Sequence, residues 1–334
     1  MTAPVFKKIT YFLKKINYRE YNILYALIIM WVILFFSNEN FGNIDNIKSI
    51  LRESAFVGIA AIGMTLCIIS RNFDLSVGSM VALLAIETVW LVGKVGLVPA
   101  FLGVLVSGFI LGTFNGLIVS KVRVPAFITT LGTFYIFRAA AYIVTGGAPV
   151  KFTEKWFTVW GNGTFFGLPR PFIIFVLLTI IGTYILRGTS LGRYIMAIGN
   201  SENASRIAGI KIDNVKIMVF GLVGLFTAVS AILIGSRLWS ANPKMLSGYE
   251  FKVIAAVVLG GTALSGGKGS IFNTFISSIF FVTISNAMVL YRVDSFVIQV
   301  VTGLILLLAF SLNTVRGAIE NRVTRIRARR IAEK

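Results

Sequence analysis

Long apolar runs recur along almost the whole chain, and they constrain its fold more than any other feature. Nine of the ten runs are 16 to 25 residues long, close to the roughly 20 residues with which an α-helix crosses a bilayer. With 56% hydrophobic and only 13% charged residues, the chain cannot cover a water-soluble surface. We therefore expect an all-α integral membrane protein of about ten helices. The expected membrane elements are Tyr21–Ser37, Ala55–Ser70, Leu75–Gly93, Gly96–Ser120, Val124–Val144, Pro171–Leu186, Ile217–Trp239, Val253–Leu264, Ile271–Tyr291 and Ser295–Leu312.

The eighth run is an exception in length. Val253–Leu264 has 12 residues, too few to cross about 30 Å of hydrocarbon. We expect a half-helix enclosed by neighbouring helices, because broken backbone is tolerated in a membrane only inside protein or beside a cavity. The following segment, Gly261–Ser270, looks like a phosphate-binding loop, but its spacing is wrong by one residue and Gly269 replaces the required Ser or Thr. We interpret it as a glycine-rich bend.

The basic residues predict the orientation. If the N-terminus is inside, 21 of the 32 Lys and Arg residues lie on the cytoplasmic side and 10 on the outer side, as the positive-inside rule requires. The net charge of +19 is then a topology signal and does not indicate nucleic-acid binding. We expect a cytoplasmic basic tail at 1–20, a transmembrane domain at 21–313 and a second cytoplasmic basic tail at 314–334.

A polar stretch at 188–215 interrupts the apolar pattern, and the predicted orientation places it in the cytoplasm. Within it, Ser201 can cap a short helix, Glu202 suits the positive end of that helix, and Gly209 can end it in the left-handed conformation. Two interpretations are open. The stretch either joins two spans as a simple linker, or it presents a short helix to a soluble partner.

Three glycines recur at four-residue intervals in the fourth run. Gly108, Gly112 and Gly116 share one helix face, and small residues at this spacing let two membrane helices approach closely. We favour a packing face over the alternative that glycine is simply common in membrane helices. Asn115 adjoins this face and can bond to another helix or line a path.

Few charged residues fall inside the runs. Glu87 and Arg138 are expected to have structural partners rather than catalytic roles, because an unpaired charge in a membrane is costly. Asp74 or Ser76 is expected to cap the helix that begins nearby, with contact to a transported substrate as the alternative. The chain has no histidine and one cysteine, Cys67.

The sequence contains no recognisable combination of catalytic residues. We find no serine–histidine, cysteine–histidine or metal-ligand constellation, and we expect no cofactor bound by this chain. Transport without bond chemistry is the natural function. An ion-coupled carrier normally has carboxylates or histidines in mid-membrane, and these runs are nearly bare of them. This favours an external energy source docking on the polar stretch.

Four ordered blocks carry a resemblance to a known family. They read VGIAAIGMTLCIISRNFDLSVGSMVALLA (57–85), VPAFITTLGTFYIFRAAAYIVTGG (124–147), TSLGRYIMAIGNSENASRIAGIKIDNVKI (189–217) and GYEFKVIAAVVLGGTALSGGKGS (248–270). Together they resemble the ribose/xylose/galactose-type permease family of ABC importers from about residue 50 to 313. Four blocks in order are far more specific than a single glycine motif.

The resemblance implies a permease subunit in the bacterial inner membrane, with a fold similar to that of the vitamin B12-type importers. It implies two ABC ATPase subunits that bind the ATP, an extracytoplasmic sugar-binding protein, and a second permease copy or a paralogue. Gly248, Tyr249 and Glu250 match a block near the outer gate. The residues that resemble the ATPase-coupling helix are Asn200, Ser201, Glu202, Asn203, Ala204, Ser205, Arg206 and Gly209.

The substrate is less defined than the family. This chain has Arg71-Asn72-Phe73 where the family often has Gly-Gly-Ile, and relatives also move autoinducer-2 and nucleosides. We expect a monosaccharide, with those two classes as alternatives and a stand-alone secondary carrier as a rival reading. The residues expected to line the path or gate are Asp74, Ser76, Asn115, Thr129, Tyr249 and Glu250.

Overall fold

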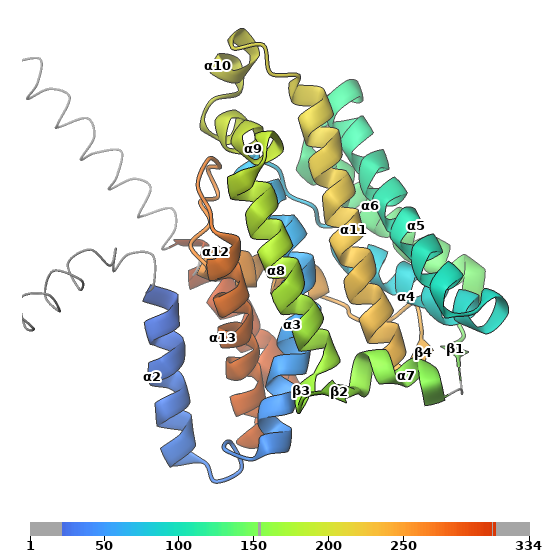
Figure 1. Ribbon diagram of the computed structural model, residues 1–334, viewed down its shortest axis with the longest axis vertical. Coiled ribbons are helices and arrows are strands. Elements are labelled where there is room, and N and C mark those ends of the chain that lie inside the picture. The colour runs from blue at the N-terminus through green and yellow to red at the C-terminus, as the bar shows by residue number, and fades with distance from the viewer. Residues whose placement is uncertain (1–21, 153–154, 309, 312–334) are drawn as a thin grey trace, which may run out of the picture.

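The computed structural model describes residues 22–152, 155–308 and 310–311, and the two predicted basic tails lie outside this range. The described chain is almost entirely helical, with two short antiparallel strand pairs (Figure 1). The helices are α2 (Asn22–Ser37), α3 (Ile44–Ile69), α4 (Val77–Val95), α5 (Leu97–Leu117), α6 (Ala126–Thr145), α7 (Lys155–Asn162), α8 (Arg170–Gly188), α9 (Ser190–Asn200), α10 (Glu202–Ile207), α11 (Ile212–Leu238), α12 (Tyr249–Leu259) and α13 (Ile271–Leu290), and a further apolar helix spans Ser295–Leu308. The π-helix η1 (Ile118–Val122) directly follows α5, strand β1 (Val150–Lys151) pairs with β4 (Ser240–Ala241), and β2 (Thr164–Phe165) pairs with β3 (Leu168–Pro169).

Seven helices are long and apolar enough to cross a membrane among the described residues. They are α3, α4, α5 with η1, α6, α8, α11 and α13, and two shorter apolar helices lie at Asn22–Ser37 and Ser295–Leu308. Each of the ten predicted runs overlaps one helix. The chain is thus a multi-pass helical membrane protein, while the total of ten membrane elements stays a prediction.

Helices α3 and α11 form the centre of the molecule. In their most apolar windows, 89% of α3 and 72% of α11 is buried, against 22–28% in α5, α6 and α8. A helix that is apolar on all sides belongs inside a protein or a membrane, and these two satisfy that condition by packing on each other and on their neighbours. The peripheral helices leave apolar faces exposed, as contact with lipid requires.

Two of the long helices begin well before their predicted starts. Helix α3 begins at Ile44, well before the predicted Ala55, because the side chain of Asn43 accepts a hydrogen bond from Asp45 N and caps it. Helix α11 begins at Ile212 rather than Ile217. The apolar runs marked only the membrane portion of each helix, and polar turns extend beyond it.

The short eighth element is helix α12. Its 11 residues span about 16 Å at 1.5 Å per residue, roughly half of the hydrocarbon thickness. It packs on α3, α4 and α13, so the expected enclosed half-helix is confirmed. Its bounds are shifted from the predicted Val253–Leu264, since it starts at Tyr249 and the chain turns back at Gly261, where φ is +79°.

The two ends of the helical bundle carry different elements (Figure 1). At one end lie α9, α10 and the loop 260–270 that follows α12. At the other end lie α7 and the two strand pairs. Lys121 pairs with Asp213 at the α10 end, and Arg237 pairs with Glu53 at the opposite end. In both pairs, residues predicted to lie on the same side of the membrane lie at the same end of the molecule.

Candidate functional site

Helix α10 is closed by local hydrogen bonds at both ends. The Ser201 hydroxyl accepts from Ala204 N at 3.2 Å, as predicted for the N-cap. At the other end, Gly209 N donates to the Arg206 carbonyl and Ile210 N to the Ser205 carbonyl, both at 3.0 Å. With Gly209 at φ +82°, these two bonds form a Schellman motif. The predicted short capped helix is confirmed.

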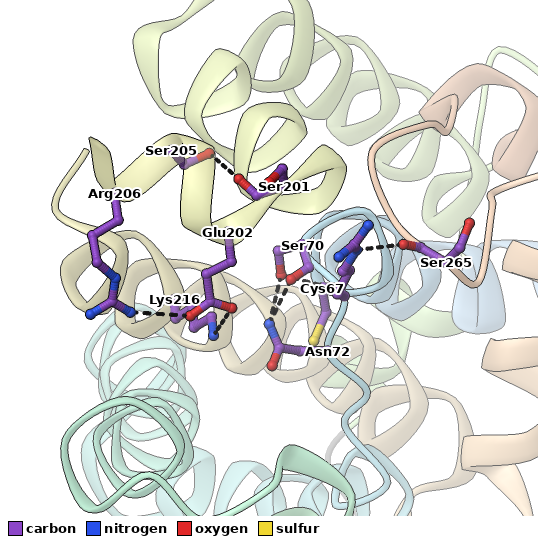
Figure 2. Close-up of polar contacts among 10 residues, drawn as sticks. Cys67, Ser70, Asn72, Ser201, Glu202, Ser205, Arg206, Lys216 and Ser265 are labelled. Carbon is purple, nitrogen blue, oxygen red and sulfur yellow. Dashed lines mark hydrogen bonds and ion pairs between the residues drawn. The ribbon is translucent and has the colours of Figure 1, made fainter. Parts of the chain in front are cut away.

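The first turn of α10 is tied to α11. Glu202 accepts from Lys216 of α11 at 2.9 Å and pairs with Arg206 at 3.6 Å (Figure 2). Lys216 is only 15% exposed, so the Glu202–Lys216 pair is better shielded from solvent than the Glu202–Arg206 pair. An exposed pair such as Glu202–Arg206 contributes little to stability. The Glu202–Lys216 pair therefore links the first turn of α10 to the start of the central helix α11.

An exposed apolar side chain marks the last turn of α10. Ile207 is 89% exposed, and it was not among the site residues predicted from sequence. One exposed isoleucine is ordinary on a protein surface. Here it stands on a capped helix at one extremity of the bundle (Figure 1), beside the exposed Asn203 and Ala204. The signal in the sequence was an isoleucine in a helix that is otherwise polar or small.

A basic hollow adjoins this helix. Its volume is about 280 Å³, and it lies between η1, the end of α10 and the start of α11. The Lys121 ammonium within it is bonded to Asp213 at 3.2 Å. The lining carries three basic residues and one acidic residue, and therefore an excess of positive charge. The hollow is lined by Lys121, Arg206, Ile210, Lys211, Ile212, Asp213 and Asn214.

The polar stretch 188–215 is not one loop with one helix. Helix α9 precedes α10, and the Thr189 hydroxyl caps it by accepting from Gly192 N. Asn200 is the last residue of α9, so its assignment to the coupling helix is corrected. The apolar positions of α9 recur at helical spacing, with Ile195 and Ile198 buried, and this pattern could have predicted the helix.

Asp74, Ser76 and Asn115 form one buried polar cluster. Asp74 accepts from Ser76 N at 2.9 Å and from the Ser76 hydroxyl at 2.6 Å. The Asn115 amide donates to the Ser76 hydroxyl at 2.9 Å and to Asp74 at 3.3 Å. Capping of α4 was predicted for Asp74 or Ser76, and neither side chain bonds to the N–H groups of its first turn. Asp74 accepts instead from the N–H of Ser76, the residue at the N-cap position. The cluster instead fastens the segment before α4 to α5.

Arg138 holds three backbone carbonyls. Its guanidinium donates to Gly78 at 3.1 Å, to Met245 at 3.0 Å and to Pro243. It thereby links α6 to the first turn of α4 and to the loop before α12, and the predicted structural pairing is confirmed. Glu87 likewise has a structural partner, since it accepts from the Ser107 hydroxyl of α5 at 2.7 Å.

Tyr249 and Glu250 begin α12 inside the bundle. The Tyr249 hydroxyl donates to the Phe56 carbonyl of α3 at 2.6 Å and lies 2.8 Å from the Ser230 hydroxyl of α11. Glu250 is 5% exposed, and its Oε2 has no hydrogen-bond partner among the described residues. Its carboxylate lies against Gly78, whose carbonyl accepts a hydrogen bond from Arg138.

The remaining path candidate, Thr129, has no hydrogen bond to these groups. Thr129 is buried in the first turn of α6, and its hydroxyl is 3.5 Å from the Val124 carbonyl. The structure therefore brings Asp74, Ser76 and Asn115 together through hydrogen bonds. It places Glu250 and Arg138 at the same residue, Gly78, and gives Thr129 only a local contact.

The glycine stripe of α5 lies directly against α11. A Cβ on Gly108 would lie 2.6 Å from the Gly224 carbonyl oxygen, and one on Gly116 would lie 2.7 Å from Ile217 Cα. A Cβ on Gly112 would overlap the Phe220 carbonyl. The stripe is therefore a helix-packing face.

Comparison with known proteins identifies a family that matches this chain. The family model described as branched-chain amino acid transport system / permease component matches residues 46–310. The ribose import permease protein RbsC of Escherichia coli (strain K12) is 39% identical over 298 residues, which cover 87% of this chain and 92% of that protein. The ribose import permease protein of Bacillus subtilis (strain 168) is 39% identical over 88% of this chain and 92% of its own length. The L-arabinose transport system permease protein AraH of Escherichia coli (strain K12) is 36% identical over 85% of this chain and 88% of its own length. No solved structure matches the chain.

Proposed function

The chain belongs to the branched-chain amino acid transport system / permease component family, and from this we propose that it is the permease subunit of an ABC importer for a monosaccharide. Relatives that match most of its length are named for ribose import and L-arabinose transport, which supports a pentose or hexose as the cargo. The seven long apolar helices supply the membrane domain.

The observation that carries the proposal is the capped helix α10. It stands at one extremity of the bundle, exposes Ile207, adjoins a basic hollow and is bonded to α11 through Lys216. We assign it as the coupling helix, which fits into a groove on an ATPase subunit. ATP is bound and hydrolysed by the ATPase subunits, and this chain converts their movement into a change of access.

The other partners follow from the same assignment. With α10 in the cytoplasm, the end that carries α7 and the strand pairs faces the extracytoplasmic binding protein. Both termini are then cytoplasmic. A second copy of the permease, or a paralogue, completes the membrane domain, and the fold is of the vitamin B12-type importer class.

Movement of α10 can reach the core through α11. Helix α11 packs along the glycine stripe of α5 and against α3. Further along, its Ser230 meets Tyr249 at the start of α12, and both side chains contact the Phe56 carbonyl of α3. A tilt of α11 therefore acts on the enclosed half-helix, where Glu250 and Arg138 lie.

Replacing Ile207 with aspartate tests the docking role of α10. We expect Ile207→Asp to weaken co-purification of the ATPase subunits at least about tenfold, because an apolar anchor at the centre of an interface commonly contributes more than ~1.4 kcal/mol. The measurement is the amount of ATPase recovered with the tagged permease from membranes.

The matched control is Ile44→Asp. Ile44 is 61% exposed and lies at the opposite end of the bundle, where α3 begins. We expect the Ile44→Asp substitution to leave ATPase recovery unchanged. If Ile207→Asp recovers as much ATPase as the wild type, α10 is not the docking element. A wild-type permease that recovers no ATPase would contradict the importer assignment itself.

A further inference from the structure

Three segments that are distant in sequence meet at Arg71. The residue follows α3 in the left-handed backbone region, with φ +63°, where an arginine carries a conformational cost that glycine does not. Its Nε donates to the Ser265 carbonyl at 2.7 Å, and its NH2 group donates to the Asn200 carbonyl at 3.0 Å. One guanidinium thus bonds the last residue of α9 to the loop that follows α12. Figure 2 shows Ser265 close to the end of α3, where Cys67, Ser70 and Asn72 lie.

The backbones of these segments are in direct contact. Gly267 N donates to the Ile69 carbonyl at 2.9 Å. A Cβ on Gly199 would overlap both the Ile69 carbonyl and Gly267 N, and one on Gly266 would overlap the Arg71 side chain. Gly266 and Gly267 also have φ of +81° and +77°. The glycines that gave this loop the appearance of a phosphate-binding motif are therefore needed for close packing.

Each segment leads to a part of the proposed transport machinery. Asn200 is followed at once by Ser201, the N-cap of α10. The loop 260–270 connects α12 with α13. Arg71 itself is followed by the segment that ends in the Asp74–Ser76–Asn115 cluster and starts α4. The junction therefore lies between the proposed docking helix and the two helices whose first turns adjoin Glu250.

We propose that Arg71 is a positioning residue that couples displacement of α10 to α12 and α4. This inference rests on the proposed function, because it assigns α10 as the element that the ATPase moves. The guanidinium holds Asn200 and Ser265 together, so that the loop 260–270 moves with the α9–α10 junction. Without it, α10 still docks on the ATPase, but its movement reaches α12 only through α11.

Arg71→Gly is the test variant. Glycine accepts the left-handed backbone without strain, so the substitution removes the two hydrogen bonds while the turn is kept. Arg123→Gly is a matched control, because Arg123 also has φ +63°, is exposed, and follows η1 next to Lys121. The Arg123 side chain has no hydrogen bond to any described residue.

The first measurement is amide hydrogen exchange of residues 263–268 in the purified permease. We expect Arg71→Gly to speed exchange about tenfold in this loop, since local opening becomes easier when hydrogen bonds that close it are removed. Arg123→Gly should leave the loop unchanged. We call the two hydrogen bonds from Arg71 to Asn200 and Ser265 the Arg71 clamp. Unchanged exchange in Arg71→Gly would show that this clamp does not hold the loop, and the result does not depend on ATPase subunits or substrate.

The second measurement is substrate uptake per ATP hydrolysed, in proteoliposomes that hold the permease and its ATPase subunits, with the binding protein added. We expect uptake per ATP to fall roughly two- to thirtyfold in Arg71→Gly, with recovery of the ATPase on the tagged permease unchanged. Arg71→Lys keeps the positive charge but loses the planar guanidinium that donates to two carbonyls at once. We expect its uptake per ATP to lie between that of Arg71→Gly and that of the wild type.

The outcomes separate the two levels of the proposal. Faster exchange with unchanged uptake per ATP overturns the coupling role of Arg71, and a lysine variant equal to the wild type overturns the two-carbonyl clamp. Loss of ATPase recovery in Arg71→Gly would make Arg71 part of the docking surface instead. If wild-type uptake continues without ATP, the proposed function fails and the coupling role fails with it, while hydrogen exchange still decides whether the clamp exists.

Discussion

At the scale of single residues, polar groups inside the bundle hold backbone segments together. Arg138 bonds three carbonyls from two other segments, and Asp74 collects donors from Ser76 and Asn115. A buried polar group without partners is costly, so such contacts decide where the loops between helices can run. Two buried oxygens nearby are not satisfied in this way, since Glu250 Oε2 and Asn115 Oδ1 have no hydrogen-bond partner among the described residues.

Asp74→Asn should destabilise the folded permease. Both Asp74 oxygens accept hydrogen bonds, and an amide replaces one of these acceptors with a donor that faces Ser76 or Asn115. We expect a loss of about 1–3 kcal/mol, seen as a lower melting temperature in detergent and lower protein levels in membranes. Asp213→Asn, at an exposed pair with Lys121, is the control and should melt like the wild type. Normal stability with lost transport would favour a role of Asp74 in the path.

Local features at this scale were predictable from sequence, and contacts between elements were not. Ser201 and Gly209 close a helix through bonds within a few residues, so the pattern alone predicted them. Ser76 also stands where an N-cap belongs. Its hydroxyl is bonded to Asp74 and to Asn115 of another helix, so it is not available to cap α4. A local sequence pattern does not reveal a hydrogen-bond partner on another helix.

At the scale of elements, small residues determine how the central helices pack. The α5–α11 contact is close because Gly108 and Gly112 face Gly224. Little hydrophobic driving force acts between helices in lipid, so close van der Waals contact has to hold them together. The central position of α11 therefore depends on residues without side chains.

Gly112→Ala should loosen the α5–α11 contact. Its Cβ would overlap the Phe220 carbonyl, and forcing an extra methyl into a packed interface typically costs about 1–3 kcal/mol. Gly103→Ala on the same helix is the control, because its Cβ would make only ordinary contact with Leu91 at 3.4 Å. Thermal unfolding in detergent should show a lower melting temperature for Gly112→Ala alone. Equal melting temperatures for the two variants would contradict the packing face.

Elements inside the membrane were easier to predict than elements at its surface. Hydrocarbon thickness sets a length that apolar runs must match, and every predicted run overlaps a helix. The short α7, the two strand pairs and α9 lie outside that constraint, and they were not predicted. Their stability comes from packing on other segments, as when Ser236 of α11 bonds to Phe157 and Gly161 of α7.

At the scale of the whole molecule, the proposed docking helix α10 and the enclosed half-helix α12 are separate elements joined by two sets of contacts. One runs from Glu202 through Lys216 and along α11 to Tyr249. The other runs through Arg71 to the loop behind α12. If the proposed function is correct, a chain built in this way would convert movement at one end into movement inside the bundle, as a permease driven by separate ATPase subunits requires.

The energy source tests this account most directly. Uptake of radiolabelled monosaccharide is measured in cells or proteoliposomes whose ATP is depleted while the ion gradient across the membrane is maintained. We expect uptake to stop, and to resume when ATP is restored on the ATPase side. Uptake that persists on the gradient alone would contradict the account and would make this chain a secondary carrier.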